Sequence, residues 1–318
     1  MGVIKISRFT FSHLSFLPKL ASKPQTWLSR RLPYLNYLFE SLGGGRSVSS
    51  HHRSRHCLDS LPQSDCWDMT ANVVSDGDTQ TRVINLCQNK LRTDIHEGNG
   101  LSRDISRVVS LSATCLQKGG VIAVPTDTIY GVACLAQNTE AIERIYEIKQ
   151  RNFQNPVAIS VGEIDDIYKW SKVTVPRTIL TDLLPGPVTV VFERSPQLNP
   201  TLNPHTNLVG IRIPNQLFIQ TLAKQCAAPI ALTSANVSGS KSCLQVEEFE
   251  NLWPKLDLVV NGGKLSDTEE SRLGSSVVDL SVPGTFRIIR PGSAHKATVA
   301  CLRNKHRLVE ISTSQQDR

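Results

Sequence analysis

From about residue 102 onwards, the spacing of apolar residues switches between two periods, and together they predict a mixed α/β fold. Apolar positions three and four apart predict helices over 105–116, 139–149 and 217–226, with a closing helix over 294–302. Short β-branched runs predict strands at 121–124, 156–161, 188–192, 208–213, 230–232, 258–260, 277–280 and 286–289. The last strands have no long helices between them. This favours a mixed sheet over a purely parallel one.

The heptapeptide Pro-Thr-Asp-Thr-Ile-Tyr-Gly at 125–131 follows directly on the apolar run 121–124. Pro125 has no N–H for a ladder, so the strand is expected to end there, and Gly131 is expected to let the chain turn away. Ligands of open α/β sheets lie outside the carboxyl ends of strands. The segment therefore predicts either a binding loop, with Asp127 as a possible acid or base, or an ordinary polar turn.

Four further polar clusters end a predicted strand or helix. Lys149 and Arg151 end a helix and are followed by Asn155, while Arg212 lies inside an apolar strand. The loop 233–239, with Ser234 and Asn236, has small residues that let backbone N–H groups approach phosphate, and Arg290 ends another strand. Each cluster alone is equally consistent with a solvated cap or turn. Taken together, several cations with one prominent carboxylate favour an anionic substrate such as a nucleoside triphosphate.

The net charge of +7 belongs to the first part of the chain rather than to the predicted domain. Residues 1–56 hold nine of the 35 Lys and Arg residues but one of the 28 acids, so the rest is close to neutral. A neutral body gives little support for a basic nucleic-acid face. No apolar stretch approaches the length of a membrane span.

Known signatures of metal sites and nucleotide enzymes are missing from the sequence. None of the eight cysteines forms a C-x-x-C pair, and the histidines have no metal-ligand spacing, which predicts reduced thiols rather than disulfides or zinc. The sequence also has no G-x-x-x-x-G-K-[ST], no G-x-G-x-x-G, and no traceable Ser-His-Asp or kinase set.

An ordered set of seven motifs closely resembles the YrdC/Sua5 family, over about residues 102–303. The motifs are PTDTIYG (125–131), KQR…NP (149–156), PGPVT (185–189), GIRIP (210–214), TSANVSG (233–239), SSVVDL (275–280) and IIRPG (288–292). The resemblance implies a single YrdC-like domain, in which a twisted mixed β-sheet flanked by helices surrounds a concave cationic pocket. It also implies synthesis of threonylcarbamoyl-AMP and pyrophosphate from L-threonine, bicarbonate and ATP with Mg²⁺, to supply N6-threonylcarbamoyladenosine for ANN-decoding tRNAs.

The same resemblance implies roles for ten residues of this chain. Thr128, Arg212 and Ser275 would bind threonine, and Lys149, Arg151 and Arg290 would stabilise charge during the reaction. The residues implied for ATP are Arg151, Asn155, Ser234, Asn236, Ser242 and Arg290.

The chain departs from the family pattern at two positions. Ser160 stands where many members have His, and Leu208 where many have Thr. The first puts one contact to threonine in doubt, whereas the second matters little if that contact is made by the backbone.

Two other functions stay open on the residues alone. The cations could serve a double-stranded RNA or tRNA-binding module without nucleotidyl transfer, or a related nucleotidyl enzyme could use another amino acid. Transfer to tRNA by downstream threonylcarbamoyl transferase machinery is implied by the resemblance only.

Composition and the family resemblance together predict four segments along the chain. Residues 1–56 are typical of a basic transit peptide or disordered leader, 57–101 of a polar linker, 102–303 of the catalytic domain and 304–318 of a polar tail. A mitochondrial and cytoplasmic protein is expected, or a plastid one in a plant. A second start at Met69 would omit the leader and keep the domain.

Overall fold

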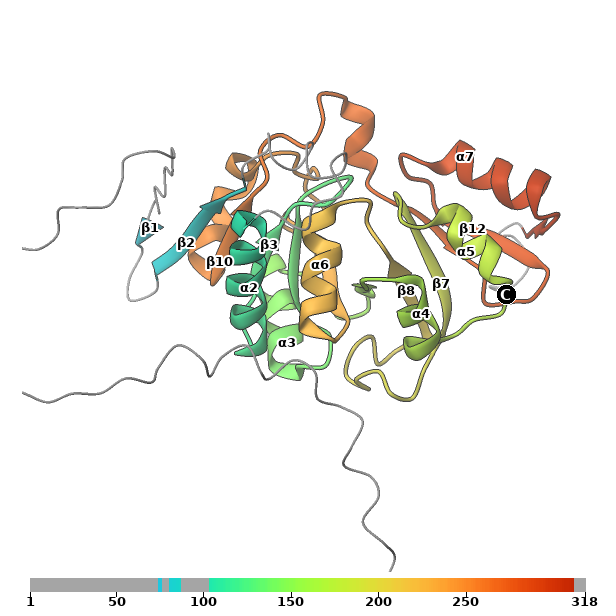
Figure 1. Cartoon of the computed structure of the whole chain (residues 1–318), viewed down its shortest axis with the longest axis horizontal. Coiled ribbons are helices and arrows are strands. Elements are labelled where there is room, and N and C mark those ends of the chain that lie inside the picture. The colour runs from blue at the N-terminus through green and yellow to red at the C-terminus, as the bar shows by residue number, and fades with distance from the viewer. Residues whose placement is uncertain (1–73, 76–79, 87–102, 312–318) are drawn as a thin grey trace, which may run out of the picture. The chain divides into compact units, whose positions relative to one another are not determined.

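The computed structural model describes residues 74–75, 80–86 and 103–311, and Figure 1 shows their arrangement. The predicted leader over 1–56 lies outside the described residues, as do most of the predicted linker and the last part of the tail.

Thirteen strands of the described part form one mixed sheet in the order β1-β2-β10-β3-β4-β9-β5-β8-β7-β11-β12-β13, with β6 paired to β7. Parallel pairs such as β5 with β8 and β7 with β11 occur beside antiparallel pairs such as β3 with β4. The predicted mixed sheet is confirmed. The strands are β1 (Val74–Ser75), β2 (Gln80–Asn85), β3 (Ile122–Val124), β4 (Gly131–Leu135), β5 (Ala158–Ser160), β6 (Ser171–Lys172), β7 (Val188–Arg194), β8 (Leu208–Arg212), β9 (Ile230–Ser234), β10 (Leu258–Asn261), β11 (Ser276–Asp279), β12 (Thr285–Arg290) and β13 (Val309–Glu310).

Helices cover both faces of this sheet. The α-helices are α2 (Arg103–Gln117), α3 (Thr139–Lys149), α4 (Ile164–Trp170), α5 (Arg177–Leu183), α6 (Leu217–Cys226) and α7 (His295–Ala300). Two 3-10 segments, η1 (Val246–Lys255) and η2 (Glu269–Leu273), and one π segment, η3 (Cys301–Lys305), complete the set.

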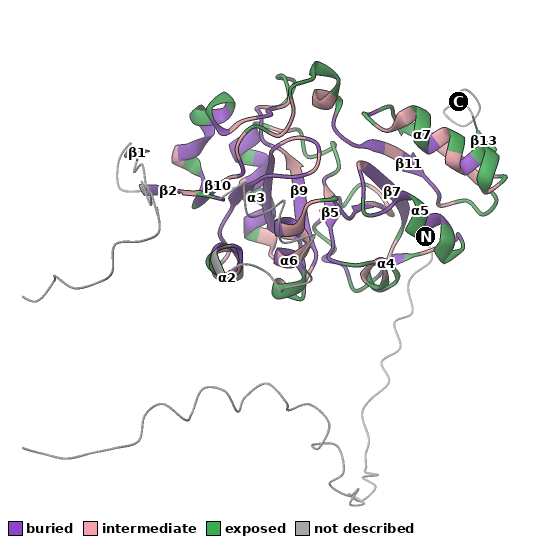
Figure 2. Ribbon diagram, turned by 45° about the horizontal axis from the view of Figure 1, so that its top comes forward, coloured by how far each residue is buried: buried purple, intermediate pink, exposed green. Residues whose placement is uncertain are grey.

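Alternate residues of the central strands enter two different apolar cores. On β3, Ile122 and Val124 pack with α2 and α6, whereas Ala123 packs with α3 on the opposite face. This alternation follows from the two-residue period of a strand. Figure 2 shows the central strands buried between exposed helix surfaces.

The face covered by α2 and α6 is the face on which the site forms. Leu232 of β9 packs in the core beneath these helices and also lines the pocket described below. Farther along the sheet, alternate residues of β8 and β7, such as Gly210 and Val191, line the same pocket instead of a helix. The pocket therefore occupies the part of this face that α2 and α6 leave uncovered.

Local interactions fix the ends of α3, which carries two of the predicted site residues. Asn138 caps its first turn, since the Asn138 Oδ1 atom accepts a hydrogen bond from the Ala141 N–H at 3.0 Å. At the other end Gln150 adopts the left-handed conformation, with φ 50°. That residue ends the helix and separates the directions of Lys149 and Arg151.

Most predicted elements are present, and the differences have physical causes. The turn expected at Gly131 is wrong: Gly131 begins β4 and pairs with Val124. A Cβ atom there would lie 2.6 Å from Leu232 Cδ1, so this glycine permits the close approach of β9. The prediction also missed α4 and α5. Strand β2 lies within the range predicted as a linker, and β13 lies within the predicted tail.

Within the described residues, we find no helix with the combined length and apolarity that crossing a membrane requires.

The fold generates one stability prediction, at Gly292 beside Arg290. A Cβ atom at Gly292 would lie 2.3–2.5 Å from backbone atoms of Ser275 and Ser276, which cannot rotate away. We expect Gly292→Ala to lower the free energy of unfolding by about 2 kcal/mol or more, measured by chemical denaturation. The control is Lys296→Ala on the exposed surface of α7. Equal stability of the two variants would contradict the packing described here.

Candidate functional site

The loop between β3 and β4 is folded by the hydroxyl of Thr126. Its Oγ1 atom accepts hydrogen bonds from the N–H groups of Thr128 at 3.1 Å and Ile129 at 3.3 Å, and donates to the Ile129 carbonyl at 2.7 Å. This is a local side-chain turn of the kind that threonine favours. Tyr130 anchors the end of the loop, because its hydroxyl donates to the Gly263 carbonyl at 2.7 Å and accepts from the Gly262 N–H at 2.9 Å.

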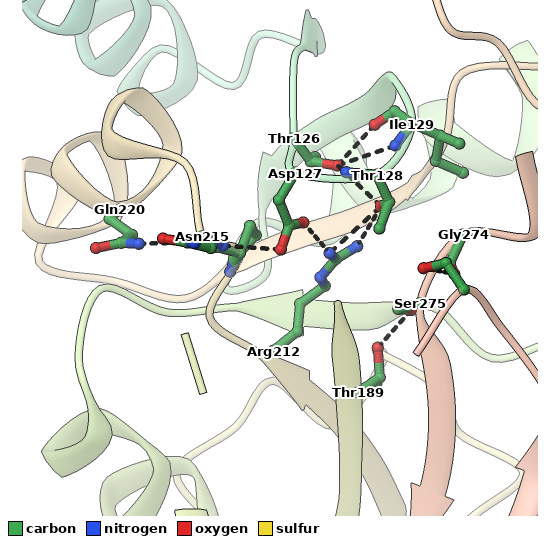
Figure 3. A network of polar contacts seen from close by, with 12 residues as sticks. Thr126, Asp127, Thr128, Ile129, Thr189, Arg212, Asn215, Gln220, Gly274 and Ser275 are labelled. Carbon is green, nitrogen blue, oxygen red and sulfur yellow. Dashed lines mark hydrogen bonds and ion pairs between the residues drawn. The ribbon is translucent and has the colours of Figure 1, made fainter. Parts of the chain in front are cut away.

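Asp127 forms a buried ion pair with Arg212, whose guanidinium it meets through Oδ1 (Figure 3). Each side chain is 8% exposed. The other oxygen, Oδ2, accepts the Asn215 N–H at 2.8 Å, and the two Nη atoms of Arg212 each lie 3.4 Å from Thr128 Oγ1. Asp127 therefore orients an arginine, and both of its oxygens are occupied. This leaves no role for it as a free acid or base.

Arg290 reaches the same region from the end of β12. Its Nη2 atom donates to the Ser275 carbonyl at 2.9 Å and lies 3.4 Å from Ser275 Oγ. The Ser275 hydroxyl also forms a 2.8 Å hydrogen bond with the Thr189 hydroxyl of β7. This chain of contacts, partly drawn in Figure 3, fixes Arg290 and two hydroxyls, one on β7 and one just before β11.

Lys149 points beneath the loop 233–238 rather than into the pocket. It is 1% exposed, and its Nζ atom donates to the carbonyls of Ser234 and Asn236. Burial, with a smaller contribution from Arg151, lowers the pKa of Lys149 to about 8. The lysine thus holds the loop through charge-assisted hydrogen bonds at neutral pH.

Arg151 is held from its own loop after α3. Its Nε atom donates to the Asn155 carbonyl at 3.2 Å and its Nη2 atom to the Pro156 carbonyl at 3.0 Å. These two bonds fix the guanidinium beside the segment that leads into β5, while leaving its remaining donors available.

These elements surround a pocket of about 450 Å³. Six of the ten predicted site residues line it, namely Arg151, Asn155, Arg212, Ser234, Ser275 and Arg290. The other four, Thr128, Lys149, Asn236 and Ser242, are not among the lining residues. Thr128 contacts the Nη atoms of Arg212 through its hydroxyl, and the Asn236 amide donates to the Ser240 carbonyl at 2.7 Å within its own loop. The contact found at Ser242 is a 2.6 Å hydrogen bond from Arg272 to its carbonyl.

Three arginines give the pocket its electrostatic character. Burial lowers the pKa of Arg290, and the charge of Arg151 lowers it further. Burial also lowers the pKa of Arg212, which Asp127 opposes and Arg290 reinforces. Both arginines nevertheless stay charged at neutral pH, because the pKa of an arginine starts far above it. The guanidinium groups therefore repel one another across the pocket, and an anion bound between them would relieve that repulsion.

The residues that sequence reasoning did not single out come from alternate positions of the strands. Thr189, Val191, Gly210 and Val277 all line the pocket. The signal for Thr189 was a hydroxyl inside the apolar run of β7. For the apolar residues the sequence gave no signal that separates a pocket wall from ordinary core.

The two departures from the family pattern occupy different places. Leu208 lines the pocket. Ser160, at the end of β5, is fully buried, and its hydroxyl has no hydrogen-bond partner among the described residues. It stands beside Arg212 in the parallel register of β5 and β8, where a histidine would be bulkier.

A divalent ion would find few protein ligands in this pocket. Among the described residues that line it, none is acidic, and both oxygens of the nearby Asp127 are already bonded. Mg²⁺ prefers carboxylates, phosphate oxygens and water. The lining therefore does not fit a resident Mg²⁺ ion.

Comparison with known sequences gives consistent matches. The Sua5/YciO/YrdC family, described as telomere recombination, matches residues 114–292. The chain is 53% identical over 201 residues to the threonylcarbamoyl-AMP synthase of Homo sapiens, covering 63% of this chain and 72% of that protein. It is 29% identical over 198 residues to the protein of the same name in Bacillus subtilis, covering 60% and 55%.

Solved structures share the fold. The P. abyssi Sua5 structure complexed with L-threonine has a TM-score of 0.56 and 26% identity, and the match covers 67% of this chain and 58% of that one. The structure of E. coli YciO, at 23% identity and a TM-score of 0.55, covers 68% and 96% and supports the fold alone. Since the family match spans more than half of the chain, this protein belongs to the Sua5/YciO/YrdC family.

Proposed function

We propose that this chain is an L-threonylcarbamoyladenylate synthase, an enzyme of the nucleotidyltransferase class. It joins L-threonine, bicarbonate and ATP into threonylcarbamoyl-AMP and pyrophosphate. The observation that carries the proposal is the set of three arginines around one pocket, of which Arg212 alone has a carboxylate partner among the described residues. Relatives named for this activity support the choice of substrates.

The part of the pocket around Arg212 suits the amino acid. The guanidinium is fixed by Asp127, and its buried Nε atom has no partner among the described residues. An N–H in this state favours an added acceptor, because a buried donor without a partner costs about 1–3 kcal/mol. We assign the role of that acceptor to the threonine carboxylate. Ser275, just before β11, and Thr189 of the neighbouring β7 supply two hydroxyls to the lining of the same pocket.

The part around Arg151 and Arg290 suits the triphosphate. Guanidinium groups bind phosphate oxygens bidentately, and both arginines lose some of their hydration through burial. Ser234 lines this pocket on the loop that Lys149 fixes from below. Lys149 is therefore a positioning residue in this proposal. Mg²⁺ would arrive as part of the ATP substrate, held by phosphate oxygens and water.

The proposed chemistry needs no protein nucleophile. The threonine amine and bicarbonate first form a carbamate with loss of water, and a carbamate oxygen then attacks the α-phosphate. The bond between the α- and β-phosphates breaks, and pyrophosphate leaves. The chain contributes orientation of the two anions and fixed positive charge at the phosphates, which the arginine arrangement supplies.

The wider setting is also a proposal. The product would pass to tRNA threonylcarbamoyl transferase machinery for modification of ANN-decoding tRNAs. The basic segment 1–56 would direct part of the protein to mitochondria or plastids and leave the rest in the cytoplasm. Direct tRNA binding is not needed for this reaction.

The first test is removal of a phosphate-binding arginine. We expect Arg151→Ala or Arg290→Ala to lower turnover at least about tenfold, a barrier change near 1.4 kcal/mol. The measurement is pyrophosphate release with ATP and bicarbonate, comparing threonine, serine and no amino acid. Arg177→Ala is the matched control, since Arg177 pairs with Asp165 on the exposed surface of α5. Unchanged turnover in both pocket variants would remove the proposed role.

The second test concerns the carboxylate that orients Arg212. We expect Asp127→Asn to raise KM for threonine about tenfold, the loss of one charge-assisted hydrogen bond, while KM for ATP changes less than about twofold. This split distinguishes positioning from general loss of folded protein, which would lower the apparent kcat and leave both KM values unchanged. Asp165→Asn on α4 serves as control. Equal changes in the two KM values would count against the assignment.

The third test uses the lowered pKa of Lys149. Below a pKa of about 8 the ammonium is charged and holds the loop 233–238, and above it the charge is lost. We therefore expect Mg-ATP affinity to fall at least about threefold between roughly pH 7 and pH 9. Calorimetric titration without threonine or bicarbonate measures this binding step alone. Lys149→Met should bind weakly with little pH dependence, and Lys172→Met, at an exposed ion pair, should behave as wild type. A wild-type affinity that is flat across this range would contradict the role of the lysine.

A further inference from the structure

Three side chains with different donor atoms meet between α5 and the C-terminal helical segment, apart from the residues that line the pocket. They are Asp182 of α5, Cys301 at the start of η3, and His306 just after it. One ligand atom from each lies within 4.8 Å of the other two. Figure 1 shows α5 beside α7, the helix that continues into η3. A carboxylate, a thiol and an imidazole at this spacing form a set that can hold a metal ion.

A local change of helix type brings the cysteine and the histidine together. Residues five apart on a regular α-helix point about 140° away from each other, at 3.6 residues per turn. Here the chain widens into a π turn, and the His306 N–H donates to the Cys301 carbonyl at 3.2 Å, five residues back. The wider turn brings both side chains to the side facing α5. Single π turns of this kind often occur at functional sites.

The Asp182 carboxylate already binds a lysine ammonium and lies beside an imidazole. Asp182 Oδ2 lies 2.6 Å from His306 Nε2, and Oδ1 lies 2.7 Å from Lys305 Nζ. The side chains of His306 and Asp182 are 12% and 24% exposed, whereas that of Lys305 is 64% exposed. An exposed lysine ion pair contributes little to stability, so Lys305 can move into water at small cost.

We propose that Asp182, Cys301 and His306 form a binding site for Zn²⁺ or a similar borderline-soft divalent metal, with water as the fourth ligand. Thiolate and imidazole select this class of metal over Mg²⁺ and Ca²⁺. Tetrahedral bonds of the usual length place oxygen and nitrogen ligands about 3.4 Å apart. The contact between Asp182 and His306 therefore opens as the ion takes its place. The Cys301 thiol gives up its proton to solvent, the imidazole keeps its proton on Nδ1, and Lys305 leaves the carboxylate.

This site is independent of the proposed synthase activity. None of its three residues lines the arginine pocket. Its effect is to fasten the C-terminal segment to α5, because the ligands come from both. Metal binding and catalysis can therefore fail or succeed separately.

The experiment is a titration of the full chain with Co²⁺, whose bond to a thiolate gives an ultraviolet charge-transfer band. Side chains of types that can bind metal also occur around the end of the predicted leader, at His51, His52, His56 and Cys57, so variants must separate the two regions. We expect a thiolate band that saturates near one equivalent, is displaced by Zn²⁺, and is lost in Cys301→Ser and His306→Ala. Cys57→Ala and Cys226→Ala should keep it. A band that survives in Cys301→Ser, one that disappears in Cys57→Ala, or the absence of any band overturns the proposal.

Thermal unfolding supplies a second readout that a merely structural role of Cys301 would not produce. At about 100 times its dissociation constant, Zn²⁺ should raise the Tm of the wild type by about 5 °C or more. Cys301→Ser should unfold near the wild-type Tm without metal and show no rise with it. An equal rise in both proteins would contradict the site.

Discussion

The buried ion pair between Asp127 and Arg212 is the contact on which the site depends. It joins the loop after β3 to the end of β8, and the Asp127 carboxylate also fixes the backbone at Asn215. Removing one partner of such a pair leaves an uncompensated buried charge, which costs about 3–5 kcal/mol. The interaction therefore does more than join two segments. It permits an arginine to remain inside an apolar sheet with a fixed direction, and so creates a buried cation that a small anion can reach.

The other two pocket arginines differ from Arg212 in having no carboxylate partner among the described residues. Arg151 and Arg290 are each held by backbone carbonyls rather than by carboxylates, so their positive charge is not cancelled. The pocket consequently keeps net attraction for anions although the body of the chain is close to neutral. A neutral surface with a local concentration of arginines fits a small polyanion better than a nucleic-acid duplex, which spreads its charge over a long surface.

The sequence predicted the mixed sheet and most of its strands, because buried strands leave short β-branched runs that are easy to find. It also singled out the three pocket arginines, which lie inside a strand or at the end of a strand or helix, because several such cations in one set favour an anionic ligand. It did not predict which partner Arg212 would have, since Asp127 lies 85 residues away. The sequence also did not predict the direction in which the Lys149 side chain points. A lysine at a helix end can face solvent, pocket or backbone, and the left-handed Gln150 decides between them. Strand β4 was missed because its first residue is a glycine, which suggested a turn.

The central claim is that one pocket binds the amino acid and the nucleotide side by side, with Arg212 at one part and Arg151 and Arg290 at the other. A non-hydrolysable analogue of threonylcarbamoyl-AMP tests it most directly, because a single molecule then spans both parts. In a calorimetric competition, the account predicts binding at one equivalent, displacement of both threonine and ATP, and an affinity at least about a hundredfold above either substrate. Displacement of only one substrate, or simultaneous binding of the analogue with either, would contradict it.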